Sequence, residues 1–475
     1  MLTHNHINML RPWSYNIELH PEDGSVPLYL QVANTISELI RDGTLHADDA
    51  LPSTRDLAEQ MHVSRKTIVS AYEHLCIKGW LTNKPRVGTF VRAATNGGSK
   101  YETPPSGEPG AANLFIDDGL PDTTILPFAE LSRAYRQLFN RAAKWQMLGY
   151  TQPYGHERFR SAVARMLNQD RNLCVKPGNI CITRGSQMAL YLISHALLQP
   201  GDTIIVENPG YAKAYETFRC AGLNIIPIDV DHHGIIVDKV EAILAGTRVN
   251  AIYLTPRHQF PTTVTLSSDR RQQLTRLVRK YDFYVIEDDY GCEFHFSGAR
   301  LSPLYRHLPQ EKAVYIGSFS KILAPAIRIG MMAGSENVIK RVGELRSLID
   351  VQGDNTMELA ILDLIEQGSI RRHIKEATLL YAERKTYLCS QLRKLGDKVR
   401  FVNPTGGLAV WVSFPHEVNE GLTVEGLERL LAENGICALV FQLPSCDIGI
   451  RIGYASLSTK DIDKLIAFLR NTFLA

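Results

Sequence analysis

The sequence lacks the features of membrane, secreted and metal-binding proteins. Its 475 residues contain eight cysteines but no C-x-x-C pair, and no histidine cluster has the spacing of metal ligands. No apolar run is long enough to cross a bilayer, and the N-terminus lacks the basic and apolar segments of a secretion signal. We therefore expect reduced cysteines, no metal, no membrane association and a cytoplasmic location.

Low-complexity sequence and a strong net charge are also missing. The formal net charge is +2, and 44% hydrophobic with 21% charged residues is typical of a globular protein. A chain of this length exceeds one hydrophobic core, so two or three folding units are expected. Residues 1–52 hold two basic and seven acidic side chains, whereas residues 53–92 hold seven basic and three acidic ones. The basic segment is therefore where a polyanion would bind.

Composition and periodicity together predict a multidomain α/β chain. Residues 93–112, AATNGGSKYETPPSGEPGAA, almost lack large apolar residues and predict a flexible linker. After it, apolar runs such as TIIVE and FYVIED alternate with helical segments, which predicts a mostly parallel sheet covered by helices. Short strands and helices near the C-terminus predict a smaller α+β domain. The predicted domains are an N-terminal domain at 1–92, the linker at 93–112, a large domain at 113–357 and a small domain at 358–475.

The segment LPSTRDLAEQMHVSRKTIVSAYEHL, residues 51–75, predicts two short helices with caps at Ser53 and Ser64 and a tight turn between them. This is the spacing of a helix-turn-helix, in which the start of the second helix enters the major groove. Downstream, WLTNKPRVGTFV predicts two short strands with Lys84 and Arg86 at their tip, which together form a wing. A module for protein contacts with a solvated basic face is the alternative interpretation.

From Leu28 to Val91 the chain resembles the DNA-binding domain of the GntR family of bacterial regulators, through LPSTRDLA, VSRKTIVSAYEHL and RVGTFV. The resemblance implies that the partner is double-stranded DNA. Together with the basic wing tip, it gives a set of predicted DNA contacts. They are Arg55, Ser64, Arg65, Lys66, Thr67, Lys84, Arg86 and Gly88.

A second informative stretch is YIGSFSKILAPAIRIGMM, residues 315–332, where an apolar run ends in a small-residue turn before Lys321. A lysine delivered from a rigid strand end can form a Schiff base with an aldehyde cofactor. The hydroxyls of Ser318 and Ser320 and the guanidinium of Arg328 would then hold the cofactor's phosphate. Taken alone, the stretch favours a surface lysine on a loop, and only the neighbouring segments favour the cofactor interpretation.

The segment FYVIEDDYGCEF ends another strand in three carboxylates and a tyrosine, which are costly to bury unless a cation faces them. A pyridinium nitrogen is such a cation. We predict Asp288 as its partner and Tyr290 as the hydroxyl that bonds the ring's 3'-oxygen. Glu287 and Asp289 remain alternatives for the ring partner.

In ICITRGSQMALYLISHALL a strand leads through a small-residue turn into a helix. Free backbone N–H groups at such a helix start bind anions. We therefore predict that Ser186 and Gln187 contact the phosphate.

In this order the three elements, spread over residues 114–475, resemble fold-type I aminotransferases, which carry pyridoxal 5'-phosphate. With the N-terminal module in front, nearly the whole chain resembles the MocR/GabR family of pyridoxal-phosphate-dependent regulators. The resemblance implies that Tyr211 stacks on the cofactor ring and that Tyr150 reaches the neighbouring subunit's phosphate. It also implies that Arg451 grips an effector carboxylate and that the protein is a head-to-tail, domain-swapped homodimer.

The sequence departs from the resembled proteins at Phe260 and Thr263, at Lys213, and in the spacing of Asp288 and Tyr290, which only one residue separates. Aminotransferases have Asn before Pro-Thr-Gly, whereas TPRHQFPTT has Phe260 before the proline and Thr263 in place of glycine. Regulators of the resembled family share the stretch of His258 and Gln259, which favours a regulator over an enzyme. Lys213 stands where the best-known effector site of the family has a second arginine, so we predict a carboxylate contact there but a different effector.

These observations predict a transcription regulator that senses an amino acid or amine. The effector would form an external aldimine in place of Lys321, with at most residual transaminase activity. One alternative is an active aminotransferase with an accessory DNA-binding domain. Another is a DNA-binding protein whose large domain has lost the cofactor and serves for dimerisation.

Overall fold

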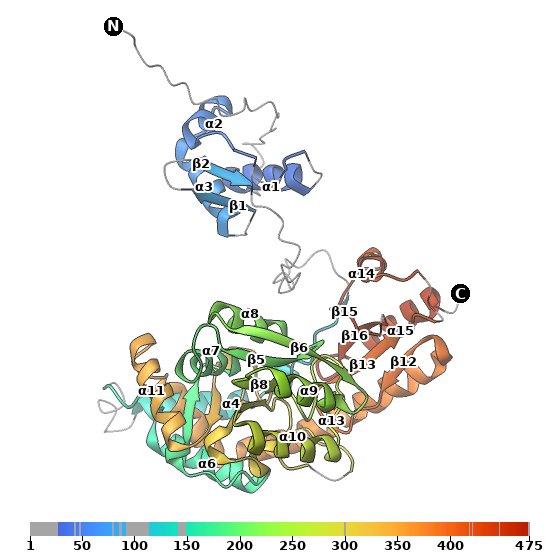
Figure 1. Ribbon diagram of the computed structural model, residues 1–475. Helices are drawn as coiled ribbons and strands as arrows, with labels where there is room; N and C mark the ends of the chain where they lie inside the picture. Colours follow the sequence, from blue (N-terminus) through green and yellow to red (C-terminus); the bar gives the residue numbers. More distant parts are fainter. Residues whose placement is uncertain are drawn as a thin grey trace. The chain divides into compact units, whose positions relative to one another are not determined.

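The computed structural model describes residues 27–41, 44–46, 49–77, 80–84, 88–91, 114–140, 149–298, 301–417, 419, 421–445 and 447–473. The chain forms two compact units, Met1–Tyr101 and Glu102–Ala475 (Figure 1). The predicted linker at 93–112 and Arg86 lie outside the described residues, as does the side chain of Lys84. None of the helices described is both long and apolar enough to span a bilayer.

The described residues of the N-terminal unit form three helices and a two-stranded antiparallel sheet, as the sequence predicts for a winged helix-turn-helix. The elements are α1 (Leu28–Arg41), α2 (Thr54–Gln60), α3 (Arg65–Ile77), β1 (Leu81–Lys84) and β2 (Gly88–Val91). Ser53 caps α2, because its side chain accepts a hydrogen bond from the Asp56 amide. The Ser64 hydroxyl accepts from the Thr67 amide at 3.1 Å in the same way. The helices enclose a small apolar core that includes Val32, Ile36, Leu57, Ile68 and Leu75.

The larger unit is built on an eight-stranded sheet in the order β4-β11-β10-β9-β8-β5-β6-β7. Strands β10, β9, β8, β5 and β6 run parallel, whereas β11 is antiparallel to both β10 and β4. Its strands are β4 (Ile180–Thr183), β5 (Thr203–Asn208), β6 (Asn224–Asp231), β7 (Gly234–Ile235), β8 (Ala251–Leu254), β9 (Tyr284–Asp288), β10 (Ala313–Ser318) and β11 (Gly330–Ala333). Every residue of β4, β8, β10 and β11 is buried, which explains the unbroken apolar runs in the sequence.

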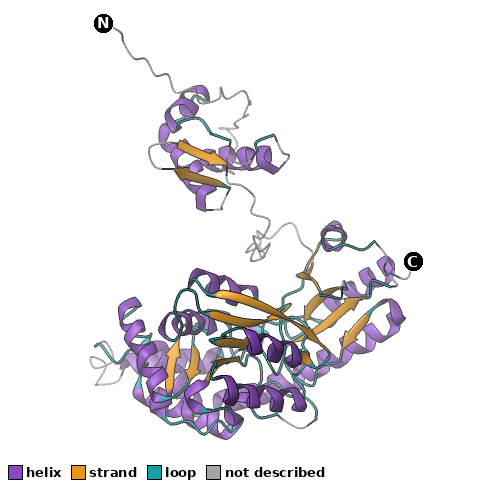
Figure 2. Cartoon of the chain, viewed as in Figure 1, coloured by secondary structure: helices purple, strands orange, loops and turns teal. Residues whose placement is uncertain are grey.

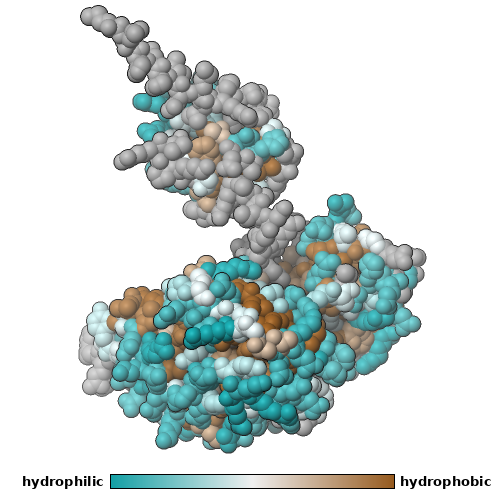
Figure 3. Space-filling model, in the orientation of Figure 1, coloured by the Kyte–Doolittle hydropathy of each residue, from teal (hydrophilic) through white to brown (hydrophobic). Residues whose placement is uncertain are grey.

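Helices cover both faces of this sheet (Figure 2). They are α4 (Phe128–Asn140), α6 (Glu157–Arg171), α7 (Ser186–Ala196), α8 (Ala212–Cys220), α9 (Val237–Gly246), α10 (Ser268–Tyr281), α11 (Glu336–Ile349) and α12 (Asn355–Glu366). Side chains alternate between two apolar clusters, so that Ile205 packs on one face and Ile204 and Val206 pack on the other. Apolar residues are nevertheless exposed at α11, where Figure 3 shows brown surface.

A smaller core lies around a four-stranded antiparallel sheet in the order β12-β13-β16-β15. Its strands are β12 (Arg400–Val402), β13 (Ala409–Phe414), β15 (Val440–Gln442) and β16 (Ile448–Gly453), and its helices are α13 (Ser369–Leu392), α14 (Val424–Glu433) and α15 (Thr459–Phe473). This arrangement agrees with the predicted α+β character of the C-terminal part.

The two cores of the larger unit do not divide the chain where the predicted domain boundaries do, as two segments show. Strand β3 (Leu114–Phe115) pairs with β14 (Ile436–Cys437), so the residues directly after the predicted linker join the smaller core. At the other end, Leu359 and Ile370 belong to the large core, while Tyr381 belongs to the smaller one. The change from the large to the smaller core falls inside α13, because residues of that helix belong to both cores.

The ends of β10, β9 and their neighbours in the large sheet determine where the candidate site lies. In the sheet register Ser318 of β10 lies beside Gly330 of β11, and Gly330 lies beside Thr183 of β4. Asp288 ends the neighbouring strand β9 at the same edge. Ligands of open α/β sheets bind at this carboxyl edge, where the loops that follow the strands converge.

Candidate functional site

Lys321 stands in the turn that follows β10. Its side chain is half-buried, and its Nζ donates a hydrogen bond to the Gly119 carbonyl oxygen at 2.8 Å. Gly119 belongs to the segment that follows β3, more than 200 residues earlier in the chain. The predicted Schiff-base lysine therefore lies between the sheet edge and the start of the larger unit.

Asp288 is the last residue of β9 and is buried. Its Oδ2 accepts a hydrogen bond from the Tyr253 hydroxyl at 3.0 Å. Burial raises the pKa of Asp288 to about 7, while the Tyr253 hydrogen bond and the charge of Lys321 act in the opposite direction. This carboxylate therefore senses the charge of the predicted anchor lysine.

The two neighbouring carboxylates have other partners. Glu287 accepts hydrogen bonds from two backbone amides, and the amide of Tyr305 lies 2.8 Å from its Oε2. Asp289 accepts from the Tyr315 hydroxyl at 2.5 Å and pairs with Arg257 at 3.4 Å. Burial opposes ionisation of Asp289, but the charges of Arg257 and Arg171 and the Tyr315 hydrogen bond together outweigh burial and lower the pKa of Asp289. These contacts support Asp288 as the ring partner, although the sequence left all three carboxylates open.

The turn between β4 and α7 lies against Arg328. Gly185 has φ +83°, and a Cβ on it would come 2.8 Å from Nη2 of Arg328. The same Nη2 donates to the Arg184 carbonyl at 2.6 Å. A guanidinium and the free amides of a helix start, with Ser186 as the first helical residue, thus lie together as an anion site requires.

The two serines before Lys321 add hydroxyls to this edge. The Ser318 Oγ accepts from the Ser320 amide at 3.1 Å. The Ser320 Oγ is buried without a hydrogen-bond partner in the described part of the chain. A buried hydroxyl without a partner is uncommon in native proteins, so this atom points to a missing ligand.

Gln187 is turned toward another helix. Its Nε2 donates to the Thr217 Oγ1 at 2.5 Å and to the Lys213 carbonyl at 3.3 Å, both on α8. The structure thus brings Ser186, Ser318, Ser320 and Arg328 to one edge but ties the Gln187 amide nitrogen to α8. Its phosphate contact stays a prediction.

Tyr211 precedes α8, and its ring lies edge-on to Phe260 at a centroid distance of 5.5 Å. Burial and the charge of Asp288 raise the pKa of Tyr211 to about 12. Tyr150, by contrast, is 88% exposed and lies outside this cluster. That exposure is compatible with the predicted contact to a neighbouring subunit.

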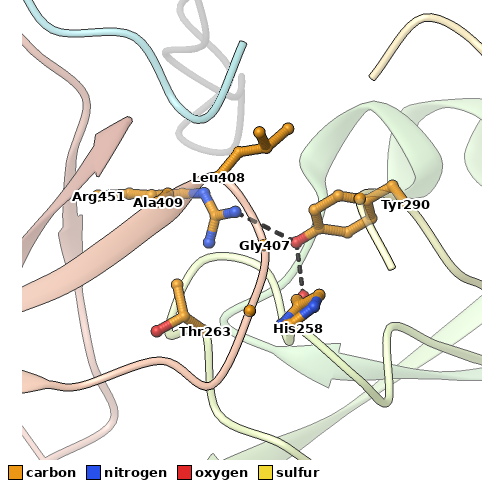
Figure 4. A pocket seen from close by; sticks show the side chains of 9 residues that line it. His258, Thr263, Tyr290, Gly407, Leu408, Ala409 and Arg451 are labelled. Atoms are coloured by element: carbon orange, nitrogen blue, oxygen red, sulfur yellow. Dashed lines mark hydrogen bonds between the residues drawn. The ribbon is translucent and has the colours of Figure 1, made fainter. Parts of the chain in front are cut away.

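Arg451 of β16 is 1% exposed and donates to three oxygens of the larger unit, of which Figure 4 shows the Tyr290 hydroxyl. They are the Asp118 carbonyl at 2.7 Å, the Pro261 carbonyl at 2.8 Å and the Tyr290 hydroxyl at 3.5 Å. The guanidinium carbon also lies 5.0 Å from the centroid of the Phe260 ring. Within the described ranges no carboxylate forms an ion pair with Arg451. A buried cation without a counter-charge is costly, so this position suits an anionic ligand.

A small cavity opens beside Arg451 (Figure 4). Its lining consists of His258, Thr263, Tyr290, Gly291, Gly406, Gly407, Leu408, Ala409 and Arg451. The Tyr290 hydroxyl donates to the His258 carbonyl at 2.6 Å. Burial lowers the pKa of His258 to about 4, so this imidazole is neutral at physiological pH. Lys213, the other predicted carboxylate contact, pairs with Glu216 at 2.8 Å instead.

Sequence reasoning missed the segment that follows β3. The carbonyls of Asp118 and Gly119 hold Arg451 and Lys321, and the turn is stabilised by the buried Asp117, which accepts from the Gly119 amide at 2.7 Å. Gly119 has φ +109°, a backbone conformation that favours glycine. The Asp-Asp-Gly pattern signals a turn, but nothing local shows which residues that turn will meet.

Ser64, Arg65, Lys66 and Thr67, four of the predicted DNA-binding residues, lie at the start of α3, whereas Arg55 lies on α2. Arg55, Ser64, Arg65 and Lys66 are exposed, and Arg65 Nε reaches the Thr54 hydroxyl at 3.5 Å. Thr67 is half-buried, and its hydroxyl lies 2.8 Å from that of Ser64. Gly88 opens β2 with φ +139°. This exposed basic end is compatible with the major-groove contact predicted from the sequence.

Comparison with known proteins finds a matching family for each of the two units. Residues 122–469 match the family of aminotransferases class I and II, and residues 28–91 match the bacterial regulatory proteins of the gntR family. The chain belongs to the aminotransferase class I and II family. It is an aminotransferase-family chain with a GntR domain in front, so the predicted MocR/GabR-type architecture is confirmed.

This aminotransferase-family chain has relatives along nearly its whole length. It is 27% identical over 464 residues to the uncharacterized HTH-type transcriptional regulator YdeL of Bacillus subtilis, covering 94% of this chain and 96% of the relative. It is 26% identical to the probable rhizopine catabolism regulatory protein MocR of Rhizobium meliloti, covering 95% of both. Among solved structures, LysN, the alpha-aminoadipate aminotransferase of Thermus thermophilus complexed with N-(5'-phosphopyridoxyl)-L-leucine, has a TM-score of 0.68. It is 25% identical, and the match covers 76% of this chain and 92% of that one.

Proposed function

We propose that the chain is a transcription regulator whose larger unit senses a small molecule with an amino group and a carboxylate. Arg451 carries this proposal, because it is a buried guanidinium that the described residues leave without a carboxylate partner. It shares one segment with the anchor lysine, since the Asp118 carbonyl accepts from Arg451 and the next carbonyl, that of Gly119, accepts from Lys321. Two consecutive carbonyls thus hold the Arg451 guanidinium, which would bind the effector's carboxylate, and the Lys321 amine, which would exchange with the effector's amine.

Pyridoxal phosphate, the cofactor predicted from the sequence, is borne out by the family and the fold. The residues suit it: the partnerless Ser320 hydroxyl, the Gly185 turn against Arg328 and the buried Asp288 correspond to a phosphate site and a ring-nitrogen site. When bound, the cofactor supplies an aldehyde carbon that bonds covalently to primary amines. Lys321 would hold it in the resting protein.

In this proposal Arg451 fixes the effector carboxylate with its planar fork of N–H donors. The effector's amine then takes the place of the Lys321 amine, as predicted from the sequence. Release of the Lys321 side chain and the new contacts of Arg451 would bias two arrangements of a homodimer, which moves the DNA-binding units. The head-to-tail, domain-swapped dimer and the DNA contacts at Arg65 and Lys66 belong to the same proposal.

An active aminotransferase is the second candidate, and the cofactor residues gathered near Lys321, among them Asp288, Ser320 and Arg328, favour it. The two functions predict different behaviour with a 2-oxo acid. A sensor binds the amine and stops, whereas an enzyme transfers amino groups repeatedly. Sustained turnover would therefore favour the enzyme.

The Lys321→Ala variant tests the sensor directly. We expect a folded dimer that binds DNA but no longer changes its DNA affinity when amino acids or amines that act on the wild type are added. Lys280→Ala, on the exposed side of α10, is the matched control and should behave as wild type. Screening both variants by cofactor absorbance and DNA-binding titration provides the measurement. An unchanged effector response in Lys321→Ala would contradict the proposal, and a wild-type protein that cannot be reconstituted with pyridoxal phosphate would point to a lost cofactor.

A further inference from the structure

The segment from Asp117 to Leu120 runs between the two groups that the proposed sensor needs. The Asp118 carbonyl accepts from Arg451 Nε at 2.7 Å, and the Gly119 carbonyl accepts from Lys321 Nζ at 2.8 Å. The buried Asp117 carboxylate fixes this turn by accepting from the Gly119 and Leu120 amides at 2.7 and 2.6 Å. An effector held at both ends would therefore lie along Asp118.

The side chain of Asp118 is not used to stabilise the turn. It is half-buried, and in the described part of the molecule its carboxylate takes part in no hydrogen bond or ion pair. Its charge nevertheless reaches both aromatic rings that flank the site. After burial and Asp288, it contributes to the raised pKa of Tyr211, and it adds to the raised pKa of Tyr290 in the same direction. Asp118 thus lies on the segment that joins Arg451 to Lys321, and its half-buried carboxylate adds a negative charge beside both groups.

Two cations near this site have other roles in the proposed sensor, since Lys321 would hold the cofactor and Arg328 its phosphate. Of the described residues that line the cavity, Arg451 is the one cation, because burial keeps His258 neutral. Lys213 is neutralised by Glu216 at 2.8 Å. A single carboxylate on the effector satisfies Arg451, and a second one would meet Asp118.

On the basis of the proposed function, we propose that Asp118 selects an effector with a second amino group, such as a diamino monocarboxylic acid, over one with a second carboxylate. A half-buried carboxylate attracts an ammonium group and repels an anion. For a partly solvated pair we expect each effect to change affinity by about 3–10-fold.

Three probes with five carbon atoms separate charge from size: L-ornithine has a second amine, L-glutamate a second carboxylate, and L-norvaline neither. Dissociation constants for the full-length holoprotein are measured by cofactor absorbance and by calorimetry. We expect L-ornithine to bind tightest and L-glutamate weakest. In Asp118→Asn, the affinity for L-ornithine should fall by about 3–10-fold and the affinity for L-glutamate should rise by a similar factor. The affinity for L-norvaline should stay unchanged.

Two further variants control the interpretation. Asp118→Glu keeps the charge and should restore the wild-type order. Asp238→Asn removes an equal charge at an exposed position on α9 and should leave the order intact. The backbone carbonyl that holds Arg451 is present in every variant, so L-norvaline affinity reports whether the carboxylate seat survives.

The outcomes are distinct. An unchanged ratio of L-ornithine to L-glutamate affinity in Asp118→Asn overturns the role of Asp118 and leaves the sensor standing. An equal loss for all three probes also overturns it, because the residue then acts on the Arg451 seat and not on the second charge. If no probe binds the wild-type holoprotein, the proposed sensor fails and the inference fails with it.

Discussion

Arg451 and Asp288 are buried charges of opposite sign that lack the partners such groups usually have. Arg451 is held by carbonyls, a phenol and a ring face, and Asp288 by a single tyrosine hydroxyl. Removing an ion from water costs several kcal/mol unless a counter-charge or hydrogen bonds replace the lost solvation. We therefore expect both residues to lower the stability of the folded protein unless a ligand supplies the missing charge.

The first prediction concerns Asp288 in the cofactor-free protein. Because its folded-state pKa is raised to about 7, the folded chain keeps a proton that the unfolded chain releases near pH 4. The stability present at low pH is therefore lost as the pH rises through about 7. Asp288→Asn has no carboxylate there and does not suffer this loss. The free energy of unfolding of the variant, relative to that of wild type, should therefore increase by about 2 kcal/mol between pH 5 and pH 8. Urea unfolding of both apo-proteins measures it, and an advantage independent of pH would contradict it.

The second prediction concerns Arg451. In Arg451→Lys the positive charge stays, but the planar fork that reaches three oxygens is lost. We expect the cofactor to remain bound, while affinity for L-norvaline falls by about tenfold or more. Butylamine, which is L-norvaline without its carboxylate, serves as the control probe and should bind both proteins equally. Absorbance titration of the cofactor measures both, and an equal loss for the two amines would argue against a carboxylate seat at Arg451.

At the scale of elements, the strands that carry the site could be predicted because they are buried on both faces. The apolar runs of β9 and β10 stand out, and their polar ends mark Asp288 and Ser318 without any knowledge of the fold. Strand β3 could not be predicted, since two residues carry no period and their pairing with β14 lies more than 300 residues away. The contribution of Asp118 and Gly119 was missed for the same reason.

The third prediction concerns the junction of β4 and α7. In Gly185→Ala the new methyl group would come 2.8 Å from Arg328, and alanine would be strained at φ +83°. We expect the sheet to fold and the affinity for pyridoxal phosphate to fall by about tenfold or more, because Arg328 must leave the helix start. Gly201→Ala is the control, since φ is +91° there and a Cβ would meet nothing within 4 Å.

Cofactor titration of the two glycine variants, together with thermal unfolding of each apo-protein, separates crowding from backbone strain. Both variants should lose similar stability, of about 1 kcal/mol, because both place alanine in a conformation that favours glycine. A similar loss of cofactor affinity in both would show that backbone strain, and not the displacement of Arg328, is responsible.

At the scale of the molecule, the order of segments along the sequence predicted two units and the character of each. What it could not predict is how the two cores of the larger unit exchange segments, because α13 is apolar on surfaces that face both cores. The smaller core includes Leu114, which precedes the residues of the large core in the sequence, and Tyr381, which follows them. The two cores are thereby tied together, and the Arg451 seat depends on both: the arginine comes from β16 and its carbonyl partners from residues 118 and 261.

The last prediction concerns assembly. Leu348, Ile349 and Val351 are 84%, 48% and 51% exposed at the end of α11, and the Gln352 side chain, next to Val351, accepts from the Thr151 amide beside the exposed Tyr150. Apolar groups gathered at one place favour association with a second copy. Leu348→Asp should raise the dimer dissociation constant by about tenfold or more, because burying a leucine contributes about 2 kcal/mol and a carboxylate opposes burial.

Sedimentation velocity measures the effect, with Leu379→Asp on α13 as a control that alters an equally apolar side chain, 61% exposed, on another element. If Tyr150 reaches the phosphate of the neighbouring subunit, dissociation has a second consequence. Cofactor affinity of Leu348→Asp should then fall as the protein is diluted, while that of Leu379→Asp stays constant. A dimer that survives in Leu348→Asp would place the interface elsewhere, and a monomer with undiminished cofactor affinity would remove Tyr150 from the site.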